Sequence, residues 1–111
     1  MSQHTIAKIN IAVTFRHTEP TEALKKHAED KLNHCLKKYL HQDTEAHVIL
    51  SVEKRDHTAE IVLKSKNHDL SSKATTSDLY SAIDRLVEIV NTQLRKQKEK
   101  ITEHKVQIEA A

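Results

Sequence analysis

Nine histidines are the first candidates for chemistry in this chain of 111 residues. His27, His34 and His41 recur every seven residues in a segment whose pattern predicts a helix. Seven residues span about 10.5 Å along a helix axis, whereas zinc ligands converge within about 2 Å of the ion. The row therefore cannot share one metal ion, and the sequence contains no HExxH motif. We expect no metal site, and we interpret the row as a solvated or pH-sensitive helix face.

Catalysis is not expected from the remaining reactive groups. Cys35, the single cysteine, falls on an apolar helical stripe, where a buried thiol is the ordinary interpretation. The chain has no glycine, which excludes Gly-rich phosphate loops and the glycine-flanked serine of hydrolases. No carboxylate and histidine form a recognisable acid–base pair. The sequence predicts a protein that is not an enzyme, with no cofactor and no small-molecule substrate.

The basic residues are unevenly distributed along the chain. Residues 22–40 carry five lysines against three acidic residues, and residues 95–105 carry five basic residues against two acidic ones. The formal net charge of the whole chain is only +2, so the rest of the chain is acidic on balance. Two concentrated basic segments favour a polyanionic partner such as nucleic acid. The alternative on charge alone is a pair of solvated helix faces.

Hydrophobic periodicity predicts the elements that carry these residues. Strict alternation over residues 6–16 predicts a strand, and an apolar stripe at spacings of three and four predicts a helix of about 19 residues after an N-cap at Thr21. Two more alternating segments, around residues 48–53 and 59–64, predict a hairpin with a polar turn at 54–57. A weaker strand over 70–75 follows a turn at 66–69. The last helix begins after Ser77 or Asp78 and continues past Ile101.

The last helix is expected to be longer than the sheet. Some 27 helical residues span about 40 Å, whereas strands of eight to ten residues reach about 30 Å. Its C-terminal turns must therefore project past the sheet, and they contain Arg95, Lys96, Lys98 and Lys100. We expect one domain over residues 1–104, followed by a frayed tail over 105–111, where the periodicity is lost.

The predicted fold class is α+β, with the order β-α-β-β-β-α. Two amphipathic helices can cover one face of a four-stranded sheet, and the other face should stay open and polar. This layout is similar to that of double-stranded RNA-binding domains. Phe15 and Tyr39 fit the core pattern, so no aromatic stacking platform is predicted on the sheet. The apolar stripes are used within the domain, so we expect a monomer whose core holds Leu24, Leu32, Leu50, Ile61, Ile83, Leu86 and Val90.

Composition indicates where such a protein resides. Only 37% of the residues are hydrophobic and 31% are charged, and no run approaches the roughly 18 apolar residues of a membrane span. The N-terminal residues lack the pattern of a secretory signal, and a single cysteine fits a reducing compartment. We expect a cytoplasmic protein.

The sequence resembles the bacterial ribosome hibernation promoting factors, also called ribosome-associated inhibitors. The resemblance is strongest in DLYSAID (78–84) and in QLRKQKEK (93–100), and it extends over about residues 9–104. Further matches are VEK (52–54), HTAE (57–60), TEAL (21–24) and KL (31–32). The family's β-α-β-β-β-α fold is the order predicted above from periodicity.

The resemblance implies a translation silencer of stationary phase and stress. Such proteins bind the small ribosomal subunit, in the channel of messenger RNA and the A- and P-site transfer RNAs, and contact ribosomal RNA through basic residues. The chain looks like the short type, which in some bacteria acts beside a separate ribosome modulation factor. The residues that match the family's RNA-binding positions are Lys25, Lys31, Lys54, Arg95, Lys96, Lys98 and Lys100.

Three departures from the family accompany the resemblance. Phe15 stands where relatives usually have glycine, which suggests a regular strand here. Residues 66–69 also lack the usual glycines, and Thr92 replaces a basic residue. An alternative function is a protein-interaction adaptor that modulates an RNA polymerase sigma factor. The basic residues at 95–100 separate the two hypotheses, because an adaptor does not need them.

Overall fold

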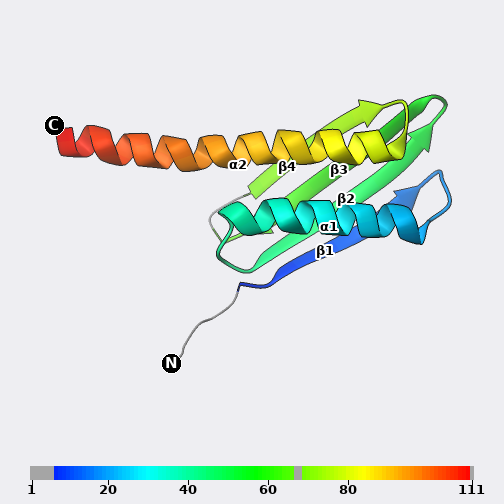
Figure 1. Ribbon diagram of the computed structural model, residues 1–111, viewed down its shortest axis with the longest axis horizontal. Coiled ribbons are helices and arrows are strands. Elements are labelled where there is room, and N and C mark those ends of the chain that lie inside the picture. The colour runs from blue at the N-terminus through cyan, green and yellow to red at the C-terminus, as the bar shows by residue number, and fades with distance from the viewer. Residues whose placement is uncertain (1–6, 67–68, 111) are drawn as a thin grey trace.

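The protein has the predicted order of elements, with two helices covering one face of a four-stranded sheet (Figure 1). The computed structural model describes residues 7–66 and 69–110, and it describes side chains as far as residue 98. The α+β fold class is confirmed. The elements are β1 (Ile9–Arg16), α1 (Glu22–Tyr39), β2 (Thr44–Glu53), β3 (Asp56–Ser65), β4 (Asp69–Thr76) and α2 (Leu79–Ala110).

The strands lie in the sheet in the order in which they occur in the chain, β1-β2-β3-β4. β1 pairs with β2 in parallel, with Ile9 opposite Thr44 and Arg16 opposite Ser51. A parallel pair requires a crossover connection, and α1 provides it. β1 keeps this register through Phe15, so the regular strand expected at that position is confirmed. β2, β3 and β4 form the predicted antiparallel meander.

The turn between β2 and β3 is shorter than predicted. Glu53 pairs with Asp56, so Lys54 and Arg55 alone form the turn, and the predicted turn residues Asp56 and His57 belong to β3. Lys54 has φ of 56°, in the left-handed region that favours glycine. The polar residues 54–57 therefore do mark the tip of the hairpin, but β2 and β3 remain paired up to the two-residue turn itself. Asp69, predicted in the next turn, likewise belongs to β4, and residues 67–68 lie outside the described part.

Both helices begin with a side-chain cap. The Thr21 hydroxyl accepts a hydrogen bond from the backbone N–H of Leu24 at 3.1 Å, as predicted. Asp78, rather than Ser77, caps α2, because its Oδ1 accepts from the backbone N–H of Ser81 at 2.9 Å. α2 continues to Ala110, so the loss of apolar periodicity after residue 104 does not end the helix.

The core lies between the helices and the inner face of the sheet. α1 packs against β1, α2 packs against β3 and β4, and the two helices contact each other. Of the seven predicted core residues, six are fully buried, whereas Leu24 is half-buried. Leu24 lies in the first turn of α1, where the helix has only begun to cover the sheet. The six buried residues are Leu32, Leu50, Ile61, Ile83, Leu86 and Val90.

The outer face of the sheet is open and polar, as predicted. Asn10 Nδ2 donates to Glu45 Oε2 at 2.9 Å, and the Thr58 and Thr75 hydroxyls are 3.0 Å apart. The apolar residues on this face include Val62, which is 38% exposed, Ile49 and Ala12.

Candidate nucleic-acid interface

The basic stretch of α2 begins where its packing on the sheet ends. Leu94 is only 2% exposed and is the last core residue of α2 among the side chains that the structure describes. Arg95, Lys96 and Lys98, which follow it, have exposed side chains. Figure 1 shows α2 continuing well past the end of the sheet, which confirms the predicted projection. None of the described side chains after Leu94 is buried, so the packing of the described core does not require Arg95, Lys96 or Lys98.

The projection starts later than the sequence predicted. Lys96 still lies beside the sheet, because it lines a shallow hollow with Gln93 of α2 and with Asp69 and Leu70 at the start of β4. Arg95 and Lys96 therefore flank the end of the sheet, and the unsupported part of α2 begins about one turn later. The side chain of Lys100 lies outside the described part of the chain.

The predicted residues of α1 do not form one stripe. Lys25 and Lys31 are both exposed. They are six residues apart, so their side chains leave the helix about 120° apart around its axis. Lys31 lies four residues after His27, on the side of α1 that meets α2.

Lys54 lies at the opposite end of the molecule from the projecting part of α2. β1 ends at Arg16, next to the end of β2, and α1 begins six residues later. The β2–β3 turn therefore lies at the end of the molecule where both helices start (Figure 1). The molecule measures 54 × 36 × 17 Å. The predicted RNA-binding residues are thus spread along its long axis and do not converge on a pocket.

The two helices are joined by polar contacts that the sequence did not reveal. His27 Nε2 lies 2.8 Å from Asp84 Oδ1, and the His27 ring meets the Tyr80 ring edge to face, with centroids 5.1 Å apart. The Tyr39 hydroxyl donates to Asn91 Oδ1 at 3.0 Å. Helical periodicity places each residue on one face of its own helix, but it does not say which residues of another helix are opposite.

The three histidines of the row, His27, His34 and His41, therefore do not share one environment. His34 and His41 are exposed, as expected for a solvated face, but His27 is half-buried against α2. Within the described part of the chain, no group of three or more histidine, cysteine, aspartate or glutamate side chains is arranged to hold a metal ion.

Cys35 lies in the interface between the helices and is 3% exposed. Its Sγ is 4.0 Å from Asn91 Oδ1. Burial raises the pKa of the thiol, and the neighbouring cation of Lys38 offsets part of that rise. A buried thiol with a raised pKa is a poor nucleophile, which agrees with the structural role predicted for Cys35.

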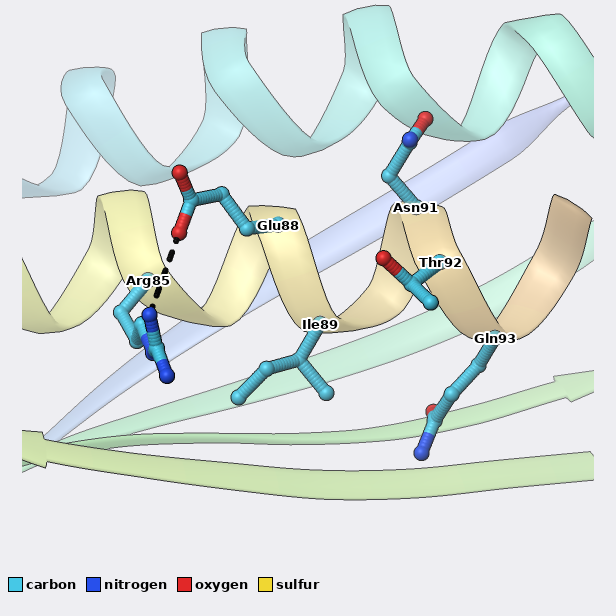
Figure 2. Close-up of a pocket in the computed structure, with 6 residues that line it drawn as sticks. All are labelled: Arg85, Glu88, Ile89, Asn91, Thr92 and Gln93. Atoms are coloured by element: carbon cyan, nitrogen blue, oxygen red, sulfur yellow. Dashed lines mark ion pairs between the residues drawn. The ribbon is translucent and has the colours of Figure 1, made fainter.

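A second hollow follows the outer flank of α2 (Figure 2). Arg85 Nη1 and Glu88 Oε1 form an ion pair there at 3.7 Å, and Ile89 points toward the strands. Gln93 Oε1 accepts a hydrogen bond of 2.6 Å from Ser72 Oγ, which fastens α2 to β4. The hollow is shallow and open: Arg85 and Glu88 pair with each other, while Asn91 and Gln93 accept hydrogen bonds from Tyr39 and Ser72 outside it. Its lining does not resemble a catalytic site.

Asp78, the cap of α2, has a carboxyl group with a lowered pKa. The backbone N–H and the hydroxyl of Ser81 both donate to Asp78, and these bonds lower the pKa of its carboxyl group below the ordinary value. The shift has a structural cause and does not point to catalysis. No helix in the described residues combines the length and apolar content needed to cross a membrane.

Comparison with known proteins gives consistent matches over most of the chain. The chain is 31% identical over 96 residues to the ribosome hibernation promoting factor of Escherichia coli K12, covering 86% of this chain and all of that one. It is 27% identical to the chloroplastic ribosome-binding factor PSRP1 of Spinacia oleracea, over 89% of this chain and 35% of that one. The N-terminal domain of Thermus thermophilus Protein Y superposes with a TM-score of 0.70 at 29% identity, covering 80% of this chain and 97% of that one.

A family model also matches residues 11–102, which include all six elements except the end of α2 and the first two residues of β1. Its description is Sigma 54 modulation protein / S30EA ribosomal protein. The family resemblance inferred from the DLYSAID and QLRKQKEK segments is therefore confirmed. The chain belongs to the Sigma 54 modulation protein / S30EA ribosomal protein family.

Proposed function

We propose that this protein is a ribosome hibernation factor, which binds the small ribosomal subunit in the channel of messenger RNA and the A- and P-site transfer RNAs. Relatives named ribosome hibernation promoting factor and ribosome-binding factor support the proposal. The observation that carries it is the basic stretch of α2, exposed where packing no longer requires the helix. The residues proposed to contact ribosomal RNA are Lys25, Lys31, Lys54, Arg95, Lys96, Lys98 and Lys100.

Binding of this kind inhibits translation without chemistry. A body of 54 × 36 × 17 Å bound in the channel would exclude the RNAs that otherwise occupy it. Cations spread along the long axis would each neutralise a phosphate and release its counterion. The protein would act in the cytoplasm, as a monomer when free, during stationary phase or stress, and in some bacteria beside a separate ribosome modulation factor.

The experiment that tests the proposal is co-sedimentation with small ribosomal subunits over a range of salt concentrations. Log affinity falls with log salt at about 0.7–0.9 per neutralised phosphate. Changing Arg95, Lys96, Lys98 and Lys100 together to alanine should weaken binding and flatten that slope by about three units. A matched control removes the same charge from four exposed lysines on other faces, Lys26, Lys37, Lys64 and Lys73. An unchanged slope in the first variant, or equal losses in both, would contradict the proposed role of α2.

The site of binding is tested by competition. If the protein occupies the decoding channel, bound protein and transfer RNA exclude each other on the small subunit. Full occupancy by both at the same time would rule this site out. Added nucleotides or metal ions should leave inhibition unchanged, because no step of the mechanism consumes or requires them.

The family description also contains the words sigma 54 modulation, which correspond to the adaptor hypothesis. No feature of the described surface favours this second function, since the projecting basic helix is unnecessary for it. The co-sedimentation experiment separates the two, because an adaptor would not bind ribosomal subunits in a salt-dependent manner.

A further inference from the structure

Tyr80 is an aromatic side chain that the fold does not need to bury. It is 45% exposed and, with Val62, is one of two exposed large hydrophobic residues among the described side chains. It lies in the first turn of α2, between Leu79, which is 6% exposed, and exposed Ser81. The core would be the same with a polar residue at this position, so the ring is free to contact a partner.

The Tyr80 ring is held in place from one side. The His27 ring of α1 meets it at an interplanar angle of 70°, with centroids 5.1 Å apart. His27 is fixed in turn by Asp84, whose Oδ1 is 2.8 Å from His27 Nε2. An edge-to-face neighbour covers at most one face of a ring, so the exposed part of Tyr80 is a flat surface of fixed orientation.

The charges beside Tyr80 indicate what that surface would bind. Asp78, the cap residue just before α2, and Asp84, one turn after Tyr80, are both acidic, so a phosphate group placed against the ring would be repelled. A nucleobase carries no charge, has a π face that stacks on tyrosine, and presents N–H donors that a carboxylate accepts. The Oδ2 of Asp84 can accept from such a donor while Oδ1 keeps its contact with His27. The surroundings of Tyr80 thus favour a base over the RNA backbone.

A cation for the adjoining phosphate lies nearby on α1. Lys31 follows His27 by four residues, so the two side chains share the side of α1 that meets α2. A nucleotide whose base stacks on Tyr80 can therefore direct its phosphate toward Lys31, which offers a cation on the side of α1 that meets α2. In this arrangement Tyr80 contacts the base of a nucleotide and Lys31 contacts its phosphate.

We propose that Tyr80 is a stacking platform for one unpaired base of ribosomal RNA, oriented by His27 and with Asp84 as an acceptor for the base. This inference rests on the proposed function, because it assumes that ribosomal RNA is the partner. It adds a contact of a different physical kind from the basic residues. Stacking releases no counterions, so it contributes affinity that does not depend on salt.

Salt dependence therefore separates the two kinds of contact. Tyr80→Ala should lower affinity for small ribosomal subunits by about 5- to 150-fold, the usual range for losing one base stack, at every salt concentration. Its slope of log affinity against log salt should equal that of the wild type. Tyr80→Phe should bind like the wild type, because the ring and not the hydroxyl is used. The matched control is Val62→Ala, which removes exposed apolar surface from the far face and should change nothing.

A fluorescence experiment tests the same proposal without the alanine variant. The chain contains no tryptophan, so Tyr80→Trp introduces a single indole. Its fluorescence should be quenched when small subunits are added, because a stacked base quenches an indole, whereas the Val62→Trp control should not respond. A blue shift without quenching would mean that a protein side chain covers position 80, and no response would mean that nothing does. Either result would overturn the proposal.

The outcomes also distinguish this inference from the proposed function. If the wild type binds small subunits and Tyr80→Ala binds them equally well, the stacking platform is wrong and ribosome binding stands. If the wild type does not bind small subunits even at low salt, both fail.

Discussion

The hydroxyl of Tyr39, in the last turn of α1, donates a hydrogen bond to Oδ1 of Asn91, in the middle of α2, at 3.0 Å. The two residues are separated by 52 positions in the chain, and the bond is partly buried. Together with the contact between His27 and Asp84, it fixes α1 against α2 at two points along their length. These polar contacts add to the shared apolar core in fixing the relative position of the two basic helices.

Tyr39→Phe should destabilise the protein by about 1 kcal/mol, the usual net value of one hydrogen bond. The ring stays in place, so the loss reflects the hydroxyl alone. Urea unfolding measures it, and a double-mutant cycle with Asn91→Ala isolates the pair. Strictly additive losses in the cycle would show that the bond contributes nothing to stability.

Lys54→Gly should stabilise the fold by about 1 kcal/mol, because Lys54 holds a left-handed φ of 56° that glycine adopts without strain. The same change should weaken ribosome binding if the Lys54 side chain contacts RNA. Arg55→Gly is the control, since Arg55 has no positive φ and should lose stability. A Lys54→Gly variant that is less stable than the wild type would contradict the argument from strain.

Leu86→Ala should cost about 2–5 kcal/mol in unfolding free energy, because Leu86 is fully buried and its removal leaves a cavity. Leu24→Ala should cost clearly less, since Leu24 is half-buried in the first turn of α1. Urea denaturation of both variants gives the comparison. Equal losses would mean that the first turn of α1 is packed as tightly as the core.

Asp78 should make the stability of the protein fall in acid. Hydrogen bonds from Ser81 lower the pKa of its carboxyl group below the ordinary 3.8. A group with a lowered pKa in the folded state contributes stability above its unfolded pKa, and the contribution is lost as pH falls through the folded value. Asp78→Asn keeps a capping oxygen at neutral pH but cannot be protonated in this range. Melting temperatures measured from pH 7 to pH 2 should therefore fall less steeply in Asp78→Asn, and parallel curves would contradict the assignment.

Local sequence patterns determined the elements of this protein. Alternation over residues 6–16 and the apolar stripes at spacings of three and four are properties of neighbouring residues, so they predicted β1, α1 and α2 without knowledge of the fold. The same holds for the Thr21 cap and for the projection of α2 past the sheet, because a helix of about 27 residues is longer than strands of eight to ten residues. Even the function class followed from the unequal distribution of lysine and arginine together with two family segments.

Tertiary structure decided everything that depends on which residues are opposite one another. Parallel pairing of β1 with β2 and the two-residue turn at Lys54 depend on register, which is set by contacts between distant segments. His27 meets Asp84 across 57 positions, so a row of three similar histidines is divided into one interface residue and two solvated ones. Tyr80 became a candidate binding residue only because the packing of the helices leaves its ring exposed, and periodicity within one helix carries no information about that packing.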